Sequence, residues 1–133
     1  MRRMMADLLL FLTDLLFLAR IREAADAVGL TYRRATTPEE LLQWARQKRP
    51  VAIICDLQAE PLQPLRAIAE VKADAALREI RTIGYFSHVR DDVRAHAVRA
   101  GCDLVLPRSA FMARLPELLR EIAADRIRAL ETS

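Results

Sequence analysis

Apolar and polar positions follow one another along this chain in two alternating rhythms. Short runs that are almost continuously apolar, such as residues 8–12 and 51–57, are typical of strands that a parallel sheet buries on both faces. Longer segments lie between these runs, and in them apolar residues recur every three or four positions, which predicts helices with one buried side. Strands and helices in alternation are the pattern of an α/β fold.

Five strand–helix units account for the chain. The predicted strands are residues 8–12, 31–36, 51–57, 82–89 and 103–107, and the predicted helices are residues 15–29, 37–48, 65–77, 91–101 and 115–130. The second strand is the most polar, so we expect it at an edge of the sheet. Because crossovers between parallel strands are right-handed, we predict a doubly wound, five-stranded parallel sheet of the flavodoxin-like (βα)5 type, with strand order 2-1-3-4-5.

The N-terminal sequence allows a second interpretation. Arg2 and Arg3 precede an apolar run, as they would in a secretory signal or a membrane anchor. However, Asp7 and Asp14 flank this run, and no small-residue cleavage site follows it. A membrane helix also needs about 20 predominantly apolar residues. We therefore interpret the run as the first strand of the fold, with no membrane segment, and a signal peptide is the alternative.

Composition narrows the class of protein. The 133 residues are 53% hydrophobic and 29% charged, which suits one globular domain with an ordinary core and argues against a disordered chain. The net charge of +3 is spread along the sequence, so we expect no nucleic-acid partner. Cys55 and Cys102 are expected to be free, buried thiols of a reducing compartment, which favours a cytoplasmic location.

Polar residues collect where the predicted strands end. Asp14 follows the first strand, Asp56 lies at the end of the third, Ser87 lies near the end of the fourth, and Arg108 follows the fifth. The carboxyl ends of parallel strands form one rim of the sheet, where folds of this type bind ligands. A carboxylate there can act as a nucleophile, and a hydroxyl and a guanidinium can bind the oxygens of a phosphoryl group.

The segments that carry these residues resemble a known family. "VAIICDL" (51–57), "TIGYFSHV" (82–89) and "AGCDLVLPRSAF" (100–111) are similar, in order and spacing, to the motifs of two-component response-regulator receiver domains of the chemotaxis-regulator type. The resemblance covers roughly residues 6–125. It implies that Asp56 is the phospho-acceptor, that Ser87 is the switch hydroxyl, and that Arg108 neutralises the phosphate in place of the family's lysine.

The same resemblance reveals departures from the family. Receivers hold Mg²⁺ with two adjacent acids after the first strand, and those positions fall on Leu12 and Thr13 here, with Asp14 one place later. Mg²⁺ prefers carboxylate oxygens in octahedral geometry, so a metal site made of Asp14 and Asp56 is expected to bind it weakly. Val105 stands where the family usually has a switch aromatic residue.

Each candidate residue also has an alternative role. Asp56 is either the acceptor or a cap of the loop after its strand, and Asp14 is either a metal ligand or the N-cap of the first helix. Ser87 is either the switch or an ordinary hydroxyl at a strand end. Arg108 either binds phosphate or pairs with Asp56, which would imitate a neutralised acceptor.

A partner surface is expected on the face made by the fourth helix, the fifth strand and the fifth helix, which receivers commonly use for partners and dimers. The residues expected on this face are Arg94, Arg99, Val105, Phe111 and Arg114. Phe111 and Met112 are expected in a turn after the fifth strand, and a core position is the alternative for Phe111. A homodimer through this face is one expected assembly.

These expectations give two functional hypotheses. The first is a stand-alone receiver-like domain spanning residues 1–133, without an output domain, in the bacterial cytoplasm. Asp56 would accept a phosphoryl group from a histidine kinase or phosphotransfer protein, and an effector protein would receive the signal. No enzymatic activity is expected beyond the domain's own phosphorylation and dephosphorylation. The second hypothesis is a pseudo-receiver, a phosphorylation-independent module for protein–protein interaction or dimerisation.

A third hypothesis belongs to a different class of protein. A flavin- or nucleotide-binding protein of this fold needs a phosphate loop rich in Gly, Ser or Thr after the first strand. The segment "TDLLFLAR" (13–20) has no such composition, so the sequence disfavours this reading.

Overall fold

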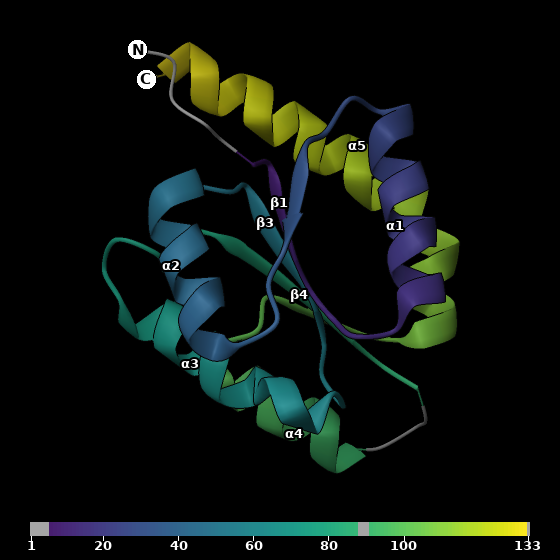
Figure 1. The fold of residues 1–133 in the computed structure, drawn as a ribbon, viewed down its shortest axis with the longest axis vertical. Coiled ribbons are helices and arrows are strands. Elements are labelled where there is room, and N and C mark those ends of the chain that lie inside the picture. The colour runs from purple at the N-terminus through teal and green to yellow at the C-terminus, as the bar shows by residue number, and fades with distance from the viewer. Residues whose placement is uncertain (1–5, 88–90, 133) are drawn as a thin grey trace.

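The computed structural model describes residues 6–87 and 91–132, and they form the expected alternation of strands and helices (Figure 1). The strands are β1 (Leu8–Phe11), β2 (Tyr32–Arg34), β3 (Ala52–Asp56), β4 (Arg81–Phe86) and β5 (Leu104–Pro107). The helices are α1 (Leu15–Ala27), α2 (Pro38–Lys48), α3 (Pro64–Ala73), α4 (Asp91–Ala100) and α5 (Arg108–Thr132), with a short 3-10 helix η1 (Glu60–Leu62). All strand pairs are parallel, in the order β2-β1-β3-β4-β5. The predicted doubly wound, flavodoxin-like sheet is confirmed, with the polar strand β2 at an edge.

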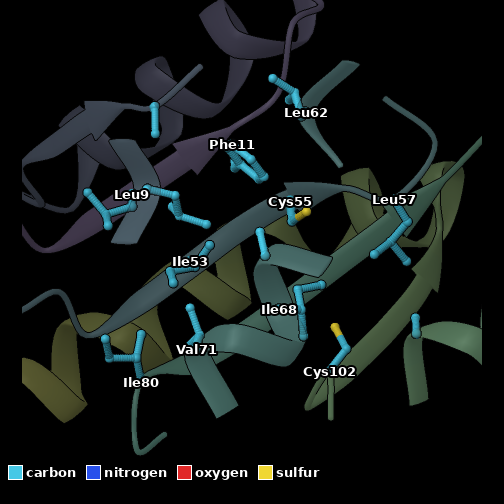
Figure 2. Close-up of a cluster of buried hydrophobic side chains, with 14 of the residues drawn as sticks. Leu9, Phe11, Ile53, Cys55, Leu57, Leu62, Ile68, Val71, Ile80 and Cys102 are labelled. Atoms are coloured by element: carbon cyan, nitrogen blue, oxygen red, sulfur yellow. The ribbon is translucent and has the colours of Figure 1, made fainter. Parts of the chain in front are cut away.

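Helices cover both faces of the sheet, because each central strand sends alternate side chains into two apolar layers. Helices α1 and α5 lie on one face, and α2, α3 and α4 lie on the other (Figure 1). Leu10 and Ile54 belong to the layer under α1 and α5. Their neighbours Phe11 and Ile53 belong to the opposite layer, where they lie with Ile68 of α3 (Figure 2).

Both cysteines lie in the layer under α2, α3 and α4. Cys55 and Cys102 are free and buried there (Figure 2). Strand alternation therefore directs Cys55 away from the side on which Asp56 projects. Burial raises the pKa of the Cys55 thiol well above its ordinary value, which makes Cys55 a core residue and not a nucleophile.

The apolar N-terminal run forms the centre of the sheet. Every residue of β1 is fully buried, and the strand pairs with β2 on one side and with β3 on the other. The interpretation of this run as the first strand is confirmed, whereas residues 1–5, which include Arg2 and Arg3, lie outside the described part. Among the described helices, none combines the length and the apolar character needed to cross a bilayer.

The last helix begins earlier than predicted. The apolar pattern predicts a start at residue 115, but α5 begins at Arg108 and contains Pro116 in its interior. A proline inside a helix costs about 3 kcal/mol, because it removes a backbone hydrogen bond. Phe111, Leu115 and Leu118 are buried at helical spacing on this stretch. Each such burial contributes about 1.5–3 kcal/mol, which together offsets the cost of the proline.

Two other element boundaries also differ from the prediction. Helix α3 ends at Ala73, four positions early, because Asp74 adopts an extended backbone conformation and its side chain accepts a hydrogen bond from Ala76 N (2.8 Å). Strand β4 ends at Phe86, and the residues 88–89 that were expected to continue it lie outside the described part.

Lys72 ties α3 to the segments that lead into β4 and β5. Its Nζ donates to the carbonyl oxygens of Arg78 (3.0 Å) and Ile80 (2.8 Å) and to Oδ2 of Asp103 (2.7 Å). The same carboxylate oxygen accepts a hydrogen bond from Thr82 N (2.8 Å). A largely buried ammonium is tolerated here because oxygen atoms surround it. This cluster therefore stabilises the end of the sheet opposite to the carboxyl rim.

Gly101→Ala is expected to destabilise the protein by about 2–4 kcal/mol. Gly101 has a φ of +100°, and a Cβ there would lie 2.9 Å from Lys72 Cγ, so left-handed strain adds to overpacking. Gly29→Ala is the control, because Gly29 has a φ of +74° but open space around a Cβ, and it should lose only about 1–2 kcal/mol. Urea unfolding measures both losses, and equal losses would contradict a role for the Lys72 contact.

Candidate functional site

Asp56 ends β3 at the carboxyl rim of the sheet and is partly buried. It is in register with Tyr85 of β4, so both side chains project from the face covered by α1 and α5. Asp56 Oδ1 accepts a hydrogen bond from Gln58 N (2.9 Å). Burial raises the pKa of Asp56 above its ordinary value, against the opposing effects of Gln58 N–H and the Arg108 charge, and the Asp14 charge raises it further. The rim therefore holds a carboxylate whose ionisation the fold disfavours.

Asp14 is the N-cap of α1, so the capping alternative is confirmed. Its Oδ1 accepts hydrogen bonds from Leu16 N (3.0 Å) and Phe17 N (3.1 Å). Its Oδ2 accepts a hydrogen bond from Arg108 Nη2 (3.1 Å). The Phe17 N–H and the Arg108 guanidinium hold the pKa of Asp14 below its ordinary value. Both oxygens of this carboxylate are thus engaged within the chain.

Arg108 reaches from the start of α5 to the start of α1. Its ion pair is with Asp14, so the alternative role of Arg108 as the partner of Asp56 is wrong, and its role as the phosphate-neutralising cation stays a prediction. The reason is local, because the guanidinium carbon also lies 4.4 Å from the centre of the Phe17 ring. This cation–π contact and the Asp14 carboxylate both belong to the first turn of α1 and hold the guanidinium there.

Gln58 joins the end of β3 to the end of β4, and the sequence analysis missed it. The expected switch residue Ser87 lies just beyond β4 and is exposed. Its backbone N–H donates to Gln58 Oε1, and Gln58 N–H donates to Asp56. The sequence signal for this role was the amide side chain of Gln58, two residues after Asp56. An amide side chain can form hydrogen bonds both with the backbone of its own loop and with a neighbouring strand.

Tyr85 is the second residue of the site that the sequence analysis missed. Its buried ring lies 4.6 Å from the Phe17 ring and 5.1 Å from the Phe111 ring, measured between centroids. Its hydroxyl is buried without a hydrogen-bond partner. Burial, with the negative charge of Asp56 as a further cause, raises the pKa of Tyr85 far above its ordinary value. The phenol therefore stays neutral, and the rim overlies an unpaired donor.

The residues of this rim do not fit a magnesium ion. Both oxygens of Asp14 already have partners, and the positive guanidinium of Arg108 lies beside them. Leu12 is buried and Thr13 carries no charge, so neither replaces the missing acid. Within the described residues, no group of three or more His, Cys, Asp or Glu is placed to hold a metal. A Mg²⁺ site made of Asp14 and Asp56 would have to displace Arg108 and the cap of α1.

Two of the five residues expected on the partner surface lie in the core. Phe111 is fully buried in α5 and Val105 is buried in β5. Phe111 and Met112 are helical and not in a turn, because Phe111 stacks on the Tyr85 ring. The core alternative for Phe111 is therefore confirmed. The remaining three residues are exposed, as expected, and their contact with a partner stays a prediction: Arg94, Arg99 and Arg114.

A small cavity opens beside the guanidinium of Arg108. It measures about 290 Å³, and its lining residues are Leu16, Phe17, Arg20, Arg108 and Met112. The lining combines apolar side chains with two arginines. This part of the rim is therefore open and apolar on the side of α1, and its only charges are positive.

Tyr85→Phe is expected to leave the free energy of unfolding unchanged or to raise it by about 1 kcal/mol. The reason is that the substitution removes a buried donor without a partner. Tyr32→Phe is the control, because the Tyr32 hydroxyl donates to Asp26 Oδ1 at the surface (3.0 Å), and its loss should cost up to about 1 kcal/mol. Urea unfolding compares the variants, and a larger loss for Tyr85→Phe would mean that its hydroxyl has a partner.

Asp56→Asn is expected to stabilise the protein at neutral pH. Because its pKa is raised, the folded chain binds this proton more tightly than the unfolded chain does. The free energy of unfolding of the parent therefore falls as the pH rises from the ordinary Asp pKa through the raised one. The gain of the variant should shrink as the pH is lowered to about 3, which urea unfolding at several pH values measures.

Asp74→Asn is the matched control, because its expected effect on the free energy of unfolding has the opposite sign. Hydrogen bonds from Ala76 N and from Arg46 hold the pKa of Asp74 below its ordinary value, so this variant should lose stability at neutral pH and approach the parent in acid. If Asp56→Asn behaved as Asp74→Asn does, the charge of Asp56 would be stabilising, against our interpretation.

Comparison with known proteins identifies the fold. No protein-family model matches the sequence, and no curated protein matches it either. The phosphorylated cyanobacterial phytochrome response regulator RcpA matches with a TM-score of 0.73 and 20% identity, over 89% of this chain and 91% of that one. A putative response regulator from Chloroflexus aurantiacus matches with a TM-score of 0.73 and 21% identity, over 90% and 98%. The receiver domain of a signal transduction histidine kinase from Syntrophus aciditrophicus matches with a TM-score of 0.75 and 15% identity, over 90% and 92%. The chain therefore has the fold of response-regulator receiver domains.

Proposed function

We propose that this chain is a signalling protein of the receiver fold that acts through protein contacts without phosphorylation of Asp56. The observation that supports this proposal is the ion pair between Arg108 Nη2 and Asp14 Oδ2 (3.1 Å) at the rim. The pair joins the cation that the resemblance assigns to a phosphoryl group, Arg108, to the carboxylate that it assigns to a metal, Asp14. It corresponds to the pseudo-receiver hypothesis.

Electrostatics at the rim disfavours phosphoryl transfer to Asp56. An ionised carboxylate must approach an anionic phosphoryl group, and cations normally reduce that repulsion. Here the charge of Arg108 is balanced by Asp14, and Asp14 itself adds negative charge near Asp56. Freeing Arg108 would require breaking its ion pair and its contact with the Phe17 ring.

The parts that would report phosphorylation are also altered. The exposed Ser87 has its backbone held by Gln58, and Val105, at the position of the usual switch aromatic, is buried. A buried valine has no ring that could move between an inward and an outward position. These features favour a single fixed state of the rim.

A second candidate function is supported by the position of Asp56. It is partly accessible at the carboxyl end of β3, where the resemblance to receivers places the phospho-acceptor, and it lies within the electrostatic reach of Arg108. Under this alternative, a histidine kinase or phosphotransfer protein would supply the phosphoryl group. Arg108 would leave Asp14 to meet the new phosphate oxygens.

Both candidates share one setting, which is also part of the proposal. The chain would work in the bacterial cytoplasm, where buried free thiols such as Cys55 and Cys102 persist. It would catalyse no reaction on another molecule, and its output would pass to a protein partner.

Intact-mass measurement with acetyl phosphate and Mg²⁺ tests the proposal. Transfer would join the phosphorus to an Asp56 oxygen and release acetate. We expect no phosphoryl mass on the parent under conditions that label an ordinary receiver, because the charge of Arg108 is already balanced by Asp14 and the transfer needs a free cation. Asp56→Asn is the control for labelling at other residues. A gain of one phosphoryl mass by the parent and none by Asp56→Asn would overturn the proposal and establish the second candidate.

A further inference from the structure

The outer face of α1 begins with two strongly exposed leucines. Leu15 is 66% exposed and Leu16 is 80% exposed, which makes Leu16 the most exposed large apolar side chain of the described residues. First turns of helices usually carry polar or acidic residues, because the helix dipole is positive there, but this first turn has no acidic residue. Adjacent exposed leucines on a helix mark a surface that another molecule covers.

The rest of the outer face of α1 carries small and charged residues. Its inner side is occupied by buried residues that pack on the sheet: Phe17, Leu18, Ile21 and Ala25. Helix α5 lies beside α1 on the same face of the sheet (Figure 1). The residues left exposed along the outer side include Ala19, Arg20, Glu23 and Ala27. Among the ion pairs of the described residues, none involves Arg20 or Glu23.

The order of these residues is self-complementary about a point between Ile21 and Arg22, close to the middle of α1. Arg20 and Glu23 lie at equal distances on either side of this point, and so do Leu16 and Ala27. When two copies of a helix pack antiparallel about a two-fold axis, residues at equal distances from the midpoint face each other across the interface. Arg20 of one copy then faces Glu23 of the other, and Leu16 of one copy faces Ala27 of the other.

We propose that α1 packs antiparallel against α1 of a second copy of this chain. In the resulting two-fold dimer, Arg20 pairs with Glu23 of the second copy, and Leu16 packs on Ala27 of the second copy. This dimer rests on the proposed function in one respect, because it identifies the surface through which a module that acts by protein contacts would associate.

A second copy suits this face better than an unrelated partner. On this face Arg20, Glu23, Leu16 and Ala27 stand in an order that an identical antiparallel helix complements. Ala19 and Ala27 leave room for close approach of the two helix backbones. The cavity beside Leu16, Arg20 and Met112 adds a hollow at each end of the pair, next to the rim.

The expected dimer is weak. Two helices of 13 residues bury less surface than the roughly 800 Å² per partner of an ordinary stable interface. We therefore expect a monomer–dimer equilibrium with a dissociation constant on the order of micromolar, and the dimer fraction should rise with protein concentration.

Sedimentation velocity over protein concentrations from about 1 to 500 µM tests the proposal. Arg20→Glu alone and Glu23→Arg alone each place like charges opposite each other twice in the dimer, so each should weaken dimerisation by about tenfold or more. The double variant Arg20→Glu/Glu23→Arg restores both pairs and should recover affinity to within about threefold of the parent. Leu16→Asp should abolish the dimer.

Two controls keep the outcome interpretable. Val98→Asp changes an exposed apolar residue of α4, on the other face of the sheet, and should dimerise as the parent does. Circular dichroism and thermal unfolding show that each variant is folded. A parent that stays monomeric throughout, single variants that dimerise as the parent does, or a double variant that fails to recover would each overturn the proposal.

Intact-mass analysis of the same samples separates this proposal from the proposed function. Labelling of Asp56 together with the expected charge-swap series would overturn only the proposed function. An unlabelled protein that is monomeric at all concentrations would overturn only the α1 dimer.

Discussion

The ion pair between Asp14 and Arg108 is the interaction on which the rest of the rim depends. It connects the first turn of α1 to the first residue of α5, across a sequence separation of 94 residues. Being partly exposed, the pair contributes little to stability by itself. The pair matters because it engages the Asp14 carboxylate and the Arg108 guanidinium with each other. Asp56 is thereby left as a single carboxylate with neither a free cation nor a metal ligand beside it.

The polar groups below this pair are incompletely satisfied. Asp56 has a raised pKa, and the Tyr85 hydroxyl is buried without a partner. The opposite end of the sheet shows the contrast, because Lys72 and Asp103 there satisfy each other and the neighbouring backbone. Natural folds keep such imperfections mainly at functional sites. The rim thus combines two unfavourable polar groups at the end of the sheet where folds of this type bind ligands.

Much of this architecture could be predicted from the sequence, and the failures have physical causes. Continuous apolar runs and helical periodicity were sufficient to locate the strands and helices, because burial decides both, and the right-handed crossovers of a doubly wound sheet led to the strand order. The start of α5 was wrong, since a local rule about Pro116 competes with the burial of Phe111, which only the packed structure reveals. The partner of Arg108 could not be predicted, because Asp14 and Asp56 both lie at the rim and the Phe17 ring decides between them. The unpaired hydroxyl of Tyr85 depends on register between strands, which periodicity alone does not provide.

Helix α1 connects the ion pair at the rim with the exposed leucines of the outer face. Asp14 fixes the first turn of α1 through Leu16 N and Phe17 N, and the next residues expose the leucines of the outer face. The same carboxylate binds Arg108, so the position of that turn and the charge state of the rim share one side chain. In a receiver, a new phosphate reorganises the rim and the change spreads to a distant surface. Here the exposed apolar surface begins directly beside the rim, and an internal cation already holds the neighbouring carboxylate, so the association through α1 that we propose would need no covalent change at Asp56.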